Sequence, residues 1–159
     1  MNRVNAIINN PKFKKYIAKN EEHEVNREFC HHDMQHFLDV ARLAYIMVLE
    51  RKLTINKEII YGAAMLHDIG RWMQYEEDIS HDLASYKLSK EILIESGYNN
   101  DEIEVILSAI LKHRKKDDNE NSFNYIFYIS DKLSRKCFLC KAANKCNWSE
   151  GKKNYKIIY

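Results

Sequence analysis

The chain contains few residues that interrupt helices: Pro11 is its one proline, and four of its 159 residues are glycine. Proline lacks a backbone donor and glycine favours turns, so a chain poor in both is suited to helices joined by few tight turns. No segment approaches the roughly 20 consecutive apolar residues that a membrane-spanning helix requires. Residues Met1 to Pro11 lack the apolar core of a secretory signal peptide. We therefore expect a cytoplasmic protein with no membrane partner.

The chain also lacks a large excess of charge of either sign. It has 25 basic and 23 acidic residues, for a net charge of +2. Such a balance produces no overall field that would attract nucleic acid, so the sequence carries no strong nucleic-acid signal. The length suits a single domain, and 45% apolar residues are enough for a core. The oligomeric state is left open, and an oligomer is compatible with the sequence.

Apolar residues recur at helical spacing in five segments, and no segment alternates as a strand does. We expect helices over residues 33–50, 56–68, 81–96, 99–113 and 123–136. Asn56 and either Asn99 or Asn100 are candidate N-caps, and Gly70 and Gly97 are stop signals. The expected inward residues of the third and fourth helices are Leu83, Leu88, Ile92 and Leu93, then Ile103, Ile106, Leu107, Ile110 and Leu111.

These segments predict an all-α, single-domain helical bundle. Residues 1–29 would add peripheral N-terminal helices, and residues 30–136 would form the helical domain with a metal site in its core. Residues 137–159 would be a cysteine-containing tail packed on the same domain.

His67 and Asp68 stand together at the end of the apolar run Ala64–Leu66. An ionised carboxylate in apolar surroundings is costly without a partner, and a metal ion is a strong one. Further histidines and a second aspartate follow in a consistent order. The full set is His36, His67, Asp68, His81, His113 and Asp131.

Four imidazoles and two carboxylates suit a transition metal better than magnesium or calcium. The six side chains would come from different helices, which is how a bundle builds a metal site in its core. A single histidine on an apolar helix face is more simply a hydrogen-bonded core residue, but the complete set favours metal. We interpret His23, His31 and His32 as surface residues.

This order of residues resembles the HD-domain superfamily of metal-dependent phosphohydrolases over roughly residues 30–135, and in particular its small stand-alone bacterial members. In two-metal members, the resemblance implies that one ion is held by His36, His67 and Asp131, the other by His81 and His113, and both by a bridging Asp68. With a single metal, the ligands would be His36, His67, Asp68 and Asp131. His81 and His113 would then line the pocket and contact phosphate. The expected cofactor is one or two ions of iron, manganese, cobalt, nickel or zinc.

A site with two divalent cations and two carboxylates keeps a positive charge and would attract a phosphate group. The predicted function is therefore hydrolysis of a phosphate ester or anhydride of a nucleotide, or of a similar small molecule, by a metal-activated hydroxide. Asp68 and Arg71 are the candidate catalytic residues. Arg71 stands where many family members have lysine, and it could clamp phosphate through two hydrogen bonds or form a surface salt bridge. Lys132 and Arg114 adjoin proposed ligands but need not face the site, because neighbouring helical residues point about 100° apart.

Two other functions remain open. The same ligands could hold a di-iron centre that activates oxygen. A non-catalytic module that senses a nucleotide would be attractive if a ligand were missing, and none is.

Three of the four cysteines form a C-x2-C-x5-C pattern near the end of the chain. They are Cys137, Cys140 and Cys146, and the fourth is Cys30. In the cytoplasm we expect thiols or metal ligands rather than disulfides. The four could hold zinc or an iron–sulfur cluster, although the spacing is not a standard paired zinc pattern. Alternatively, they are small buried residues.

Overall fold

The computed structural model describes residues 1–159 as eight α-helices and three short 3-10 helices, with no strand. The α-helices are α1 (Asn2–Asn9), α2 (Pro11–Glu24), α3 (Met34–Glu50), α4 (Lys57–Leu66), α5 (Arg71–Glu77), α6 (His81–Glu95), α7 (Asn100–Lys112) and α8 (Phe123–Leu133). The predicted all-α, single-domain fold is confirmed. No helix combines the length and the hydropathy of a membrane span.

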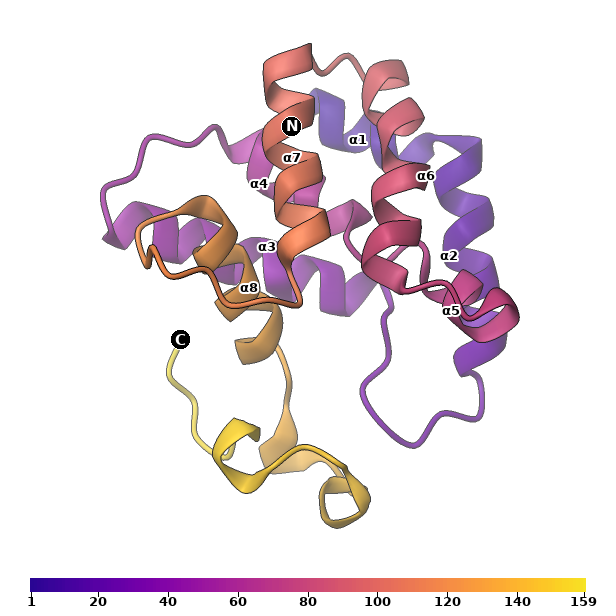
Figure 1. Cartoon of the computed structure of the whole chain (residues 1–159), viewed down its shortest axis with the longest axis vertical. Helices are drawn as coiled ribbons and strands as arrows, with labels where there is room; N and C mark the ends of the chain where they lie inside the picture. Colours follow the sequence, from indigo (N-terminus) through magenta and orange to yellow (C-terminus); the bar gives the residue numbers. More distant parts are fainter.

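Helix α4 is the centre of the bundle, because it packs against α1, α3, α6 and α7. Figure 1 shows α6 and α7 side by side, with α3 and α8 meeting below them and the yellow C-terminal segment beyond α8. All residues of α4 from Gly62 to Leu66 are buried. The N-terminal helices belong to the same core, since Val4, Ile7 and Phe13 join its main hydrophobic cluster.

Several helix ends follow local sequence signals. The Asn56 side chain accepts a hydrogen bond from the backbone of Glu58 at 2.8 Å, and Asn99 forms a capping box with Glu102. Gly97 has a φ of +82°, the left-handed conformation that ends α6. The lengths differ from our expectation, since α4 ends at Leu66 rather than at residue 68, and α8 ends at Leu133 rather than at residue 136. Helix α5 was not expected at all.

The buried face of α6 was predicted wrongly in part. Leu83 is 41% exposed, and the residues that face the core are the small Ala84, Ser85 and Ser89, together with Ile92 and Leu93. In the same way, Leu111 at the end of α7 is 39% exposed. Small side chains are needed on α6 because the chain after α4 passes very close to it.

Gly70 is the residue that allows this close passage. Its backbone N–H donates to Ser85 Oγ at 2.9 Å. A Cβ atom at Gly70 would lie 2.5 Å from the backbone nitrogen of Ser85 and 2.6 Å from the Cβ of Ala84. Its φ of −93° is open to any residue, so glycine is required here for space and not to end a helix in a left-handed turn.

We expect Gly70→Ala to lower the free energy of unfolding by about 1–3 kcal/mol, the usual cost of overpacking. The backbone of α6 would have to move, and it carries His81. Gly151→Ala is the matched control, because a Cβ there meets nothing within 4 Å. Urea unfolding followed by circular dichroism measures both. Equal midpoints for Gly70→Ala and wild type would contradict this account of the turn.

Candidate metal centre

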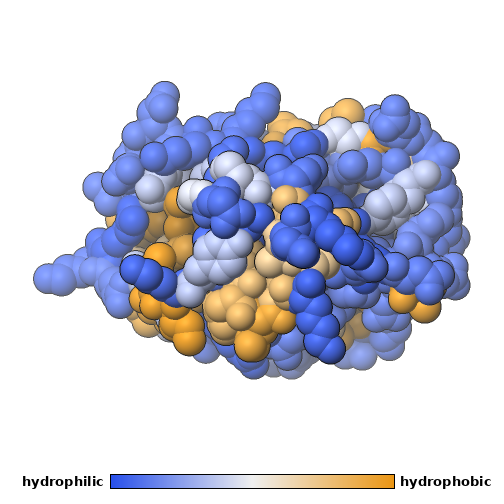
Figure 2. Space-filling view, turned by 90° about the horizontal axis from the view of Figure 1, so that it is seen from below, coloured by the Kyte–Doolittle hydropathy of each residue, from blue (hydrophilic) through white to orange (hydrophobic).

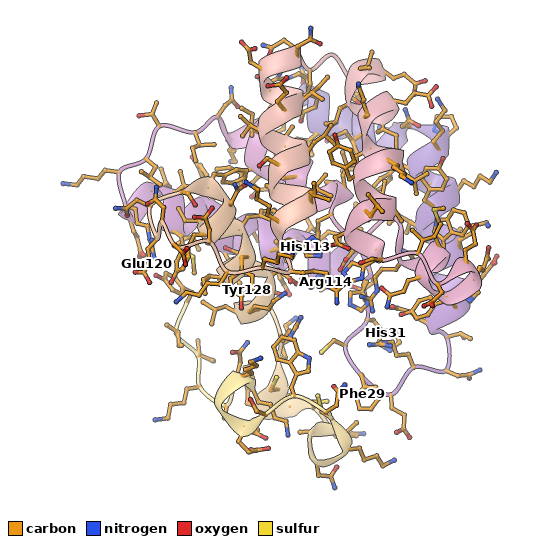
Figure 3. All side chains as sticks on the ribbon, in the orientation of Figure 1. Phe29, His31, His113, Arg114, Glu120 and Tyr128 are labelled. Carbon is orange, nitrogen blue, oxygen red and sulfur yellow. The ribbon has the colours of Figure 1, made fainter.

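The six residues singled out by their order in the sequence come together between the helices. They are His36 in the first turn of α3, His67 and Asp68 directly after α4, His81 at the start of α6, His113 at the end of α7 and Asp131 in α8. Figure 3 shows His113 and Arg114 at the lower end of α7, beside the loop that carries His31. All six side chains are buried except His36, which is partly buried.

The two carboxylate oxygens of Asp68 face two pairs of imidazoles. Oδ2 lies 3.3 Å from His67 Nε2 and 3.7 Å from His36 Nε2. Oδ1 lies 3.4 Å from His81 Nε2 and 3.6 Å from His113 Nε2. Oδ1 is also fully buried and has no hydrogen-bond partner. A buried charged oxygen without a partner fits a position next to a cation.

Within each pair, the two Nε2 atoms lie 3.2 Å apart, between His36 and His67 and between His81 and His113. Two nitrogens bound to one ion at about 2.1 Å and at right angles would be about 3.0 Å apart. Each pair, together with Asp68, forms a group of three ligand atoms within 4.8 Å of one another. Each group could therefore hold a metal ion.

Local backbone geometry orients two of the rings. His67 Nδ1 lies 2.8 Å from the carbonyl oxygen of Ala64, and His113 Nδ1 lies 2.6 Å from that of Ile110. Each carbonyl belongs to the end of the helix that precedes the histidine. A carbonyl only accepts, so Nδ1 must carry the proton and the Nε2 lone pair faces the site.

Side chains from other elements orient the remaining two rings. His36 Nδ1 lies 3.2 Å from Ser134 Oγ, which donates its own proton to the carbonyl of Asp131. His81 Nδ1 lies 2.6 Å from the Oε1 of Gln74 in α5. Partners of this kind fix the ring and raise its basicity as a ligand. Neither Ser134 nor Gln74 was identified from the sequence.

The electrostatics prepare most of these groups for metal. Burial lowers the pKa of His81 to about 3 and the pKa of His113 to about 4, so both are neutral at neutral pH. Burial also acts to lower the pKa of His67, but the charge of Asp68 outweighs it and the pKa is raised. Burial acts to raise the pKa of Asp68, and the imidazoles, His67 first, hold it well below its usual range. Because a metal binds only an unprotonated Nε2, an ion at His67 would compete with a proton there.

Asp131 adjoins one pair of histidines, but its charge is shared. Its Oδ1 lies 3.6 Å from His36 Nε2, and its Oδ2 forms ion pairs with Lys132 and Arg135. Burial acts to raise the pKa of Asp131, and these cations, Lys132 first, outweigh it and hold the pKa far below its usual range. Lys132 thus faces the site, and so does Arg114, which lines the same cavity.

A fifth histidine, His32, was wrongly interpreted as a surface residue. Its side chain is 11% exposed, and its Nε2 lies 3.8 Å from Asp68 Oδ2. Its Nδ1 lies 2.6 Å from Glu24, which also accepts hydrogen bonds from the backbone of His32 and from the hydroxyl of Tyr75. Burial acts to raise the pKa of Glu24, but the hydrogen bond from His32 leads the opposing effects and lowers it to about 2. His23 and His31 are exposed, as expected.

Arg71 is not a surface residue either. Its side chain is 12% exposed, and its Nη1 lies 3.1 Å from His81 Nδ1. Its Nη2 donates to the Tyr75 hydroxyl at 3.3 Å, and its Nε is buried without a hydrogen-bond partner. Its Nε also lies 3.9 Å from Glu24 Oε1, so Arg71 does form a salt bridge, but one that is largely buried rather than on the surface. The guanidinium lines the cavity, with Nη1 next to His81 and Nε next to Glu24.

The site opens into a cavity of about 820 Å³. Its lining includes Asp68, Arg71, His81, His113, Arg114, Asp131, Lys132, Arg135 and Trp148. Cations therefore surround the buried carboxylates. The C-terminal segment forms the far wall, and Figure 2 views the molecule from this side, where most of the surface is hydrophilic.

The four cysteines lie apart from this cluster. All four are free thiols, and no three of their sulfur atoms fall within 4.8 Å of one another. Three of them, Cys30, Cys137 and Cys146, line the same cavity as the histidines.

Comparison with known proteins agrees with this geometry. The family model of the HD domain matches residues 33–136. An uncharacterized protein of Clostridium beijerinckii is 47% identical over the full length of both chains. Ribonuclease Y of Mycoplasma mycoides subsp. mycoides SC is 30% identical over 101 residues, which cover 64% of this chain and 18% of that protein. Ribonuclease Y of Mycoplasma capricolum is 29% identical over the same shares.

No solved structure matches the chain. The matched segment contains all six residues of the cluster, from His36 to Asp131. The chain belongs to the HD domain family, whose members are generally metal-dependent phosphohydrolases.

Proposed function

We propose that the protein is a phosphohydrolase that uses two divalent transition metal ions and acts on a nucleotide or a similar small phosphorylated molecule. The observation that supports this most directly is the position of Asp68, whose two oxygens face two separate pairs of imidazoles. A carboxylate with one oxygen for each pair is suited to bridging two ions.

The ligands divide accordingly. His36, His67 and Asp131 would hold the first ion, His81 and His113 would hold the second, and Asp68 would contact both. Bound ions of this kind polarise phosphoryl oxygens and lower the pKa of a bound water so that hydroxide is present near neutral pH. Because most of the ligands are imidazole nitrogens, the site favours iron, manganese, cobalt, nickel or zinc over magnesium.

The protein's own cations would bind and orient the phosphate. Arg71 lines the cavity with its Nη1 beside His81, and a guanidinium can hold two phosphate oxygens at once. Lys132 and Arg114 add positive charge at the cavity wall. Tyr75 and Glu24 hold the Arg71 side chain on its other side, which keeps its fork directed at the site.

The cavity supports a substrate of nucleotide size. Its volume of about 820 Å³ lies within the range of about 300–1,000 Å³ that is typical of small-molecule sites. Trp148 contributes an aromatic face to the wall, and the Arg135 guanidinium stacks on it at 3.6 Å. An aromatic face beside a phosphate site is suited to stacking on a base.

The similarity to ribonuclease Y adds short RNA to the substrates worth testing. The chain matches only 18% of that protein, so an RNA substrate does not carry over from the name alone. The oxygen-activating alternative uses the same ligands and predicts oxygen consumption by the iron form. A nucleotide-sensing module predicts binding without turnover.

We expect the protein loaded with manganese, iron, cobalt or nickel to release product from at least one compound in a panel of nucleotides, dinucleoside polyphosphates and short RNA. Asp68→Asn should lower kcat by more than about 100-fold, since even outer partners of metal ligands cost about 10–100-fold. Asp39→Asn is the matched control, because Asp39 pairs with Lys136 away from the cluster. No turnover of any compound by fully loaded protein would refute the hydrolase.

The variant His81→Ala tests whether the chain binds two metal ions or one. Loss of one imidazole from the second pair should reduce the bound metal from about two ions per chain to about one, as measured by elemental analysis after desalting. His31→Ala is the control, because His31 is exposed on the neighbouring loop. Unchanged metal content in His81→Ala would show that the second pair holds no ion.

Arg71→Ala should raise KM more than it lowers kcat, because a phosphate clamp acts on the bound substrate as well as on the transition state. A lost charge-assisted hydrogen bond is worth about 1.5–3 kcal/mol, so KM should rise by about 10- to 100-fold. The exposed Arg42 provides the control Arg42→Ala. A KM equal to that of wild type would remove Arg71 from the phosphate site.

A further inference from the structure

The C-terminal segment after α8 has little of its own to hold it in place. Its regular structure consists of three 3-10 turns of three residues each, Cys137–Leu139, Ala143–Lys145 and Glu150–Lys152. After residue 134, Ala142 is its one buried residue, while Leu139, Ile157 and Ile158 are more than two-thirds exposed. Segments with so small an apolar core commonly depend on a cross-link or a metal.

The segment meets the loop between α2 and α3 at the cysteines. Lys145 forms an ion pair with Glu28 at 3.0 Å, immediately next to Cys146 on one side and two residues before Cys30 on the other. Cys30, Cys137 and Cys146 line the same cavity. Figure 3 shows Phe29, the residue before Cys30, directed toward the C-terminal segment. Two stretches more than 100 residues apart in the chain are thus in contact where three of their cysteines line one cavity.

Cys140 belongs to the same group. Cys140 does not line the cavity itself, but it directly follows the 3-10 turn that begins at Cys137, which does. The backbone N–H of Cys140 donates to the carbonyl of Cys137 at 3.2 Å, which closes a turn between them. A C-x2-C pair is a common spacing for two cysteine ligands of one metal.

The surroundings of the thiols are basic. Arg27, Arg135, Lys145 and Lys153 line the cavity beside the cysteines, and Arg27 donates to the carbonyl of Cys30 at 2.8 Å. Four thiolates around zinc leave a net charge of minus two, and nearby cations stabilise such a centre. The same cations lower the cost of deprotonating the thiols, which metal binding requires.

We propose that the thiolates of Cys30, Cys137, Cys140 and Cys146 together hold a metal centre, either a zinc ion or an iron–sulfur cluster. This centre fastens the C-terminal segment across the cavity. It uses none of the histidine or aspartate ligands, so it is independent of the proposed hydrolase function. Zinc bound to four sulfurs at about 2.3 Å would bring them to about 3.8 Å apart, so a single ion would draw loop and segment closer, whereas a cluster spans more widely spaced thiolates.

The test compares metal and acid-labile sulfide in untagged full-length protein purified without oxygen or chelator. Cys30→Ser and Cys140→Ser lie on opposite sides of the junction and should lose the same component. For zinc, that is about one ion per chain without sulfide. For a cluster, it is iron together with sulfide and the visible absorption. Asn144→Ser, an exposed position in the same segment, should keep the wild-type content. Asp68→Asn should keep this component while losing metal from the histidine site.

Metal and sulfide contents in both cysteine variants equal to those of wild type would overturn the proposal. Wild-type protein gives a second measurement if the variants fail to fold. Its four thiols should react slowly with a chromogenic thiol reagent until the metal is removed by chelation or oxidation, and rapidly afterwards. Immediate reaction of all four thiols in freshly purified protein would also overturn it. Neither measurement depends on turnover. The hydrolase proposal can therefore be refuted while the thiol centre is confirmed, and the thiol centre can be refuted while the hydrolase proposal is confirmed.

Discussion

The burial of the Asp68 carboxylate is the constraint on which the rest of the structure depends. Its side chain is 4% exposed, and five imidazole nitrogens face it at 3.3–3.8 Å. They belong to His32, His36, His67, His81 and His113. A buried charge is tolerated only with compensation of this kind, and one of its oxygens still lacks a hydrogen bond. The bundle is arranged so that four helices and a loop deliver those nitrogens to one point, and Gly70 allows α6 close enough for His81 to take part.

The histidine rings of the cluster are oriented in two ways, two of them by local backbone and two by side chains from other elements. His67 and His113 are each oriented by a carbonyl three residues earlier, so their geometry is local. The order of histidines and aspartates therefore predicted the cluster well. His36 and His81 depend instead on Ser134 and Gln74, which belong to other elements. An isolated serine or glutamine has no sequence signal for such a role, because only the packing of α3 against α8 and of α5 against α6 brings the partners together.

The wrong predictions have a common physical cause, which is close packing that periodicity does not encode. Leu83 has the right spacing for the core, but α6 lies so near the turn at Gly70 that only Ala84 and Ser85 fit between them. His32 and Glu24 lie in a polar stretch that has the composition of a surface. They are buried because α2 and the following loop fold back over the cluster, with Glu24 accepting hydrogen bonds from both His32 and Tyr75. Hydropathy cannot distinguish a buried polar network from a solvated one.

Arg135 connects the histidine cluster to the thiol cluster. It lies within 4.0 Å of Asp131, stacks on Trp148 at 3.6 Å and opposes the rise that burial causes in the pKa of the Cys30 thiol. Its position one turn after Asp131 is fixed by α8 and the Ser134 turn, because Ser134 is hydrogen-bonded to Asp131 and lies against His36. Metal binding at the proposed thiol centre would act on the segment that carries Trp148, and through the stacked Arg135 on the charge that offsets Asp131. Arg135 and Trp148 therefore contribute both to the wall of the cavity and to the charge balance around Asp131.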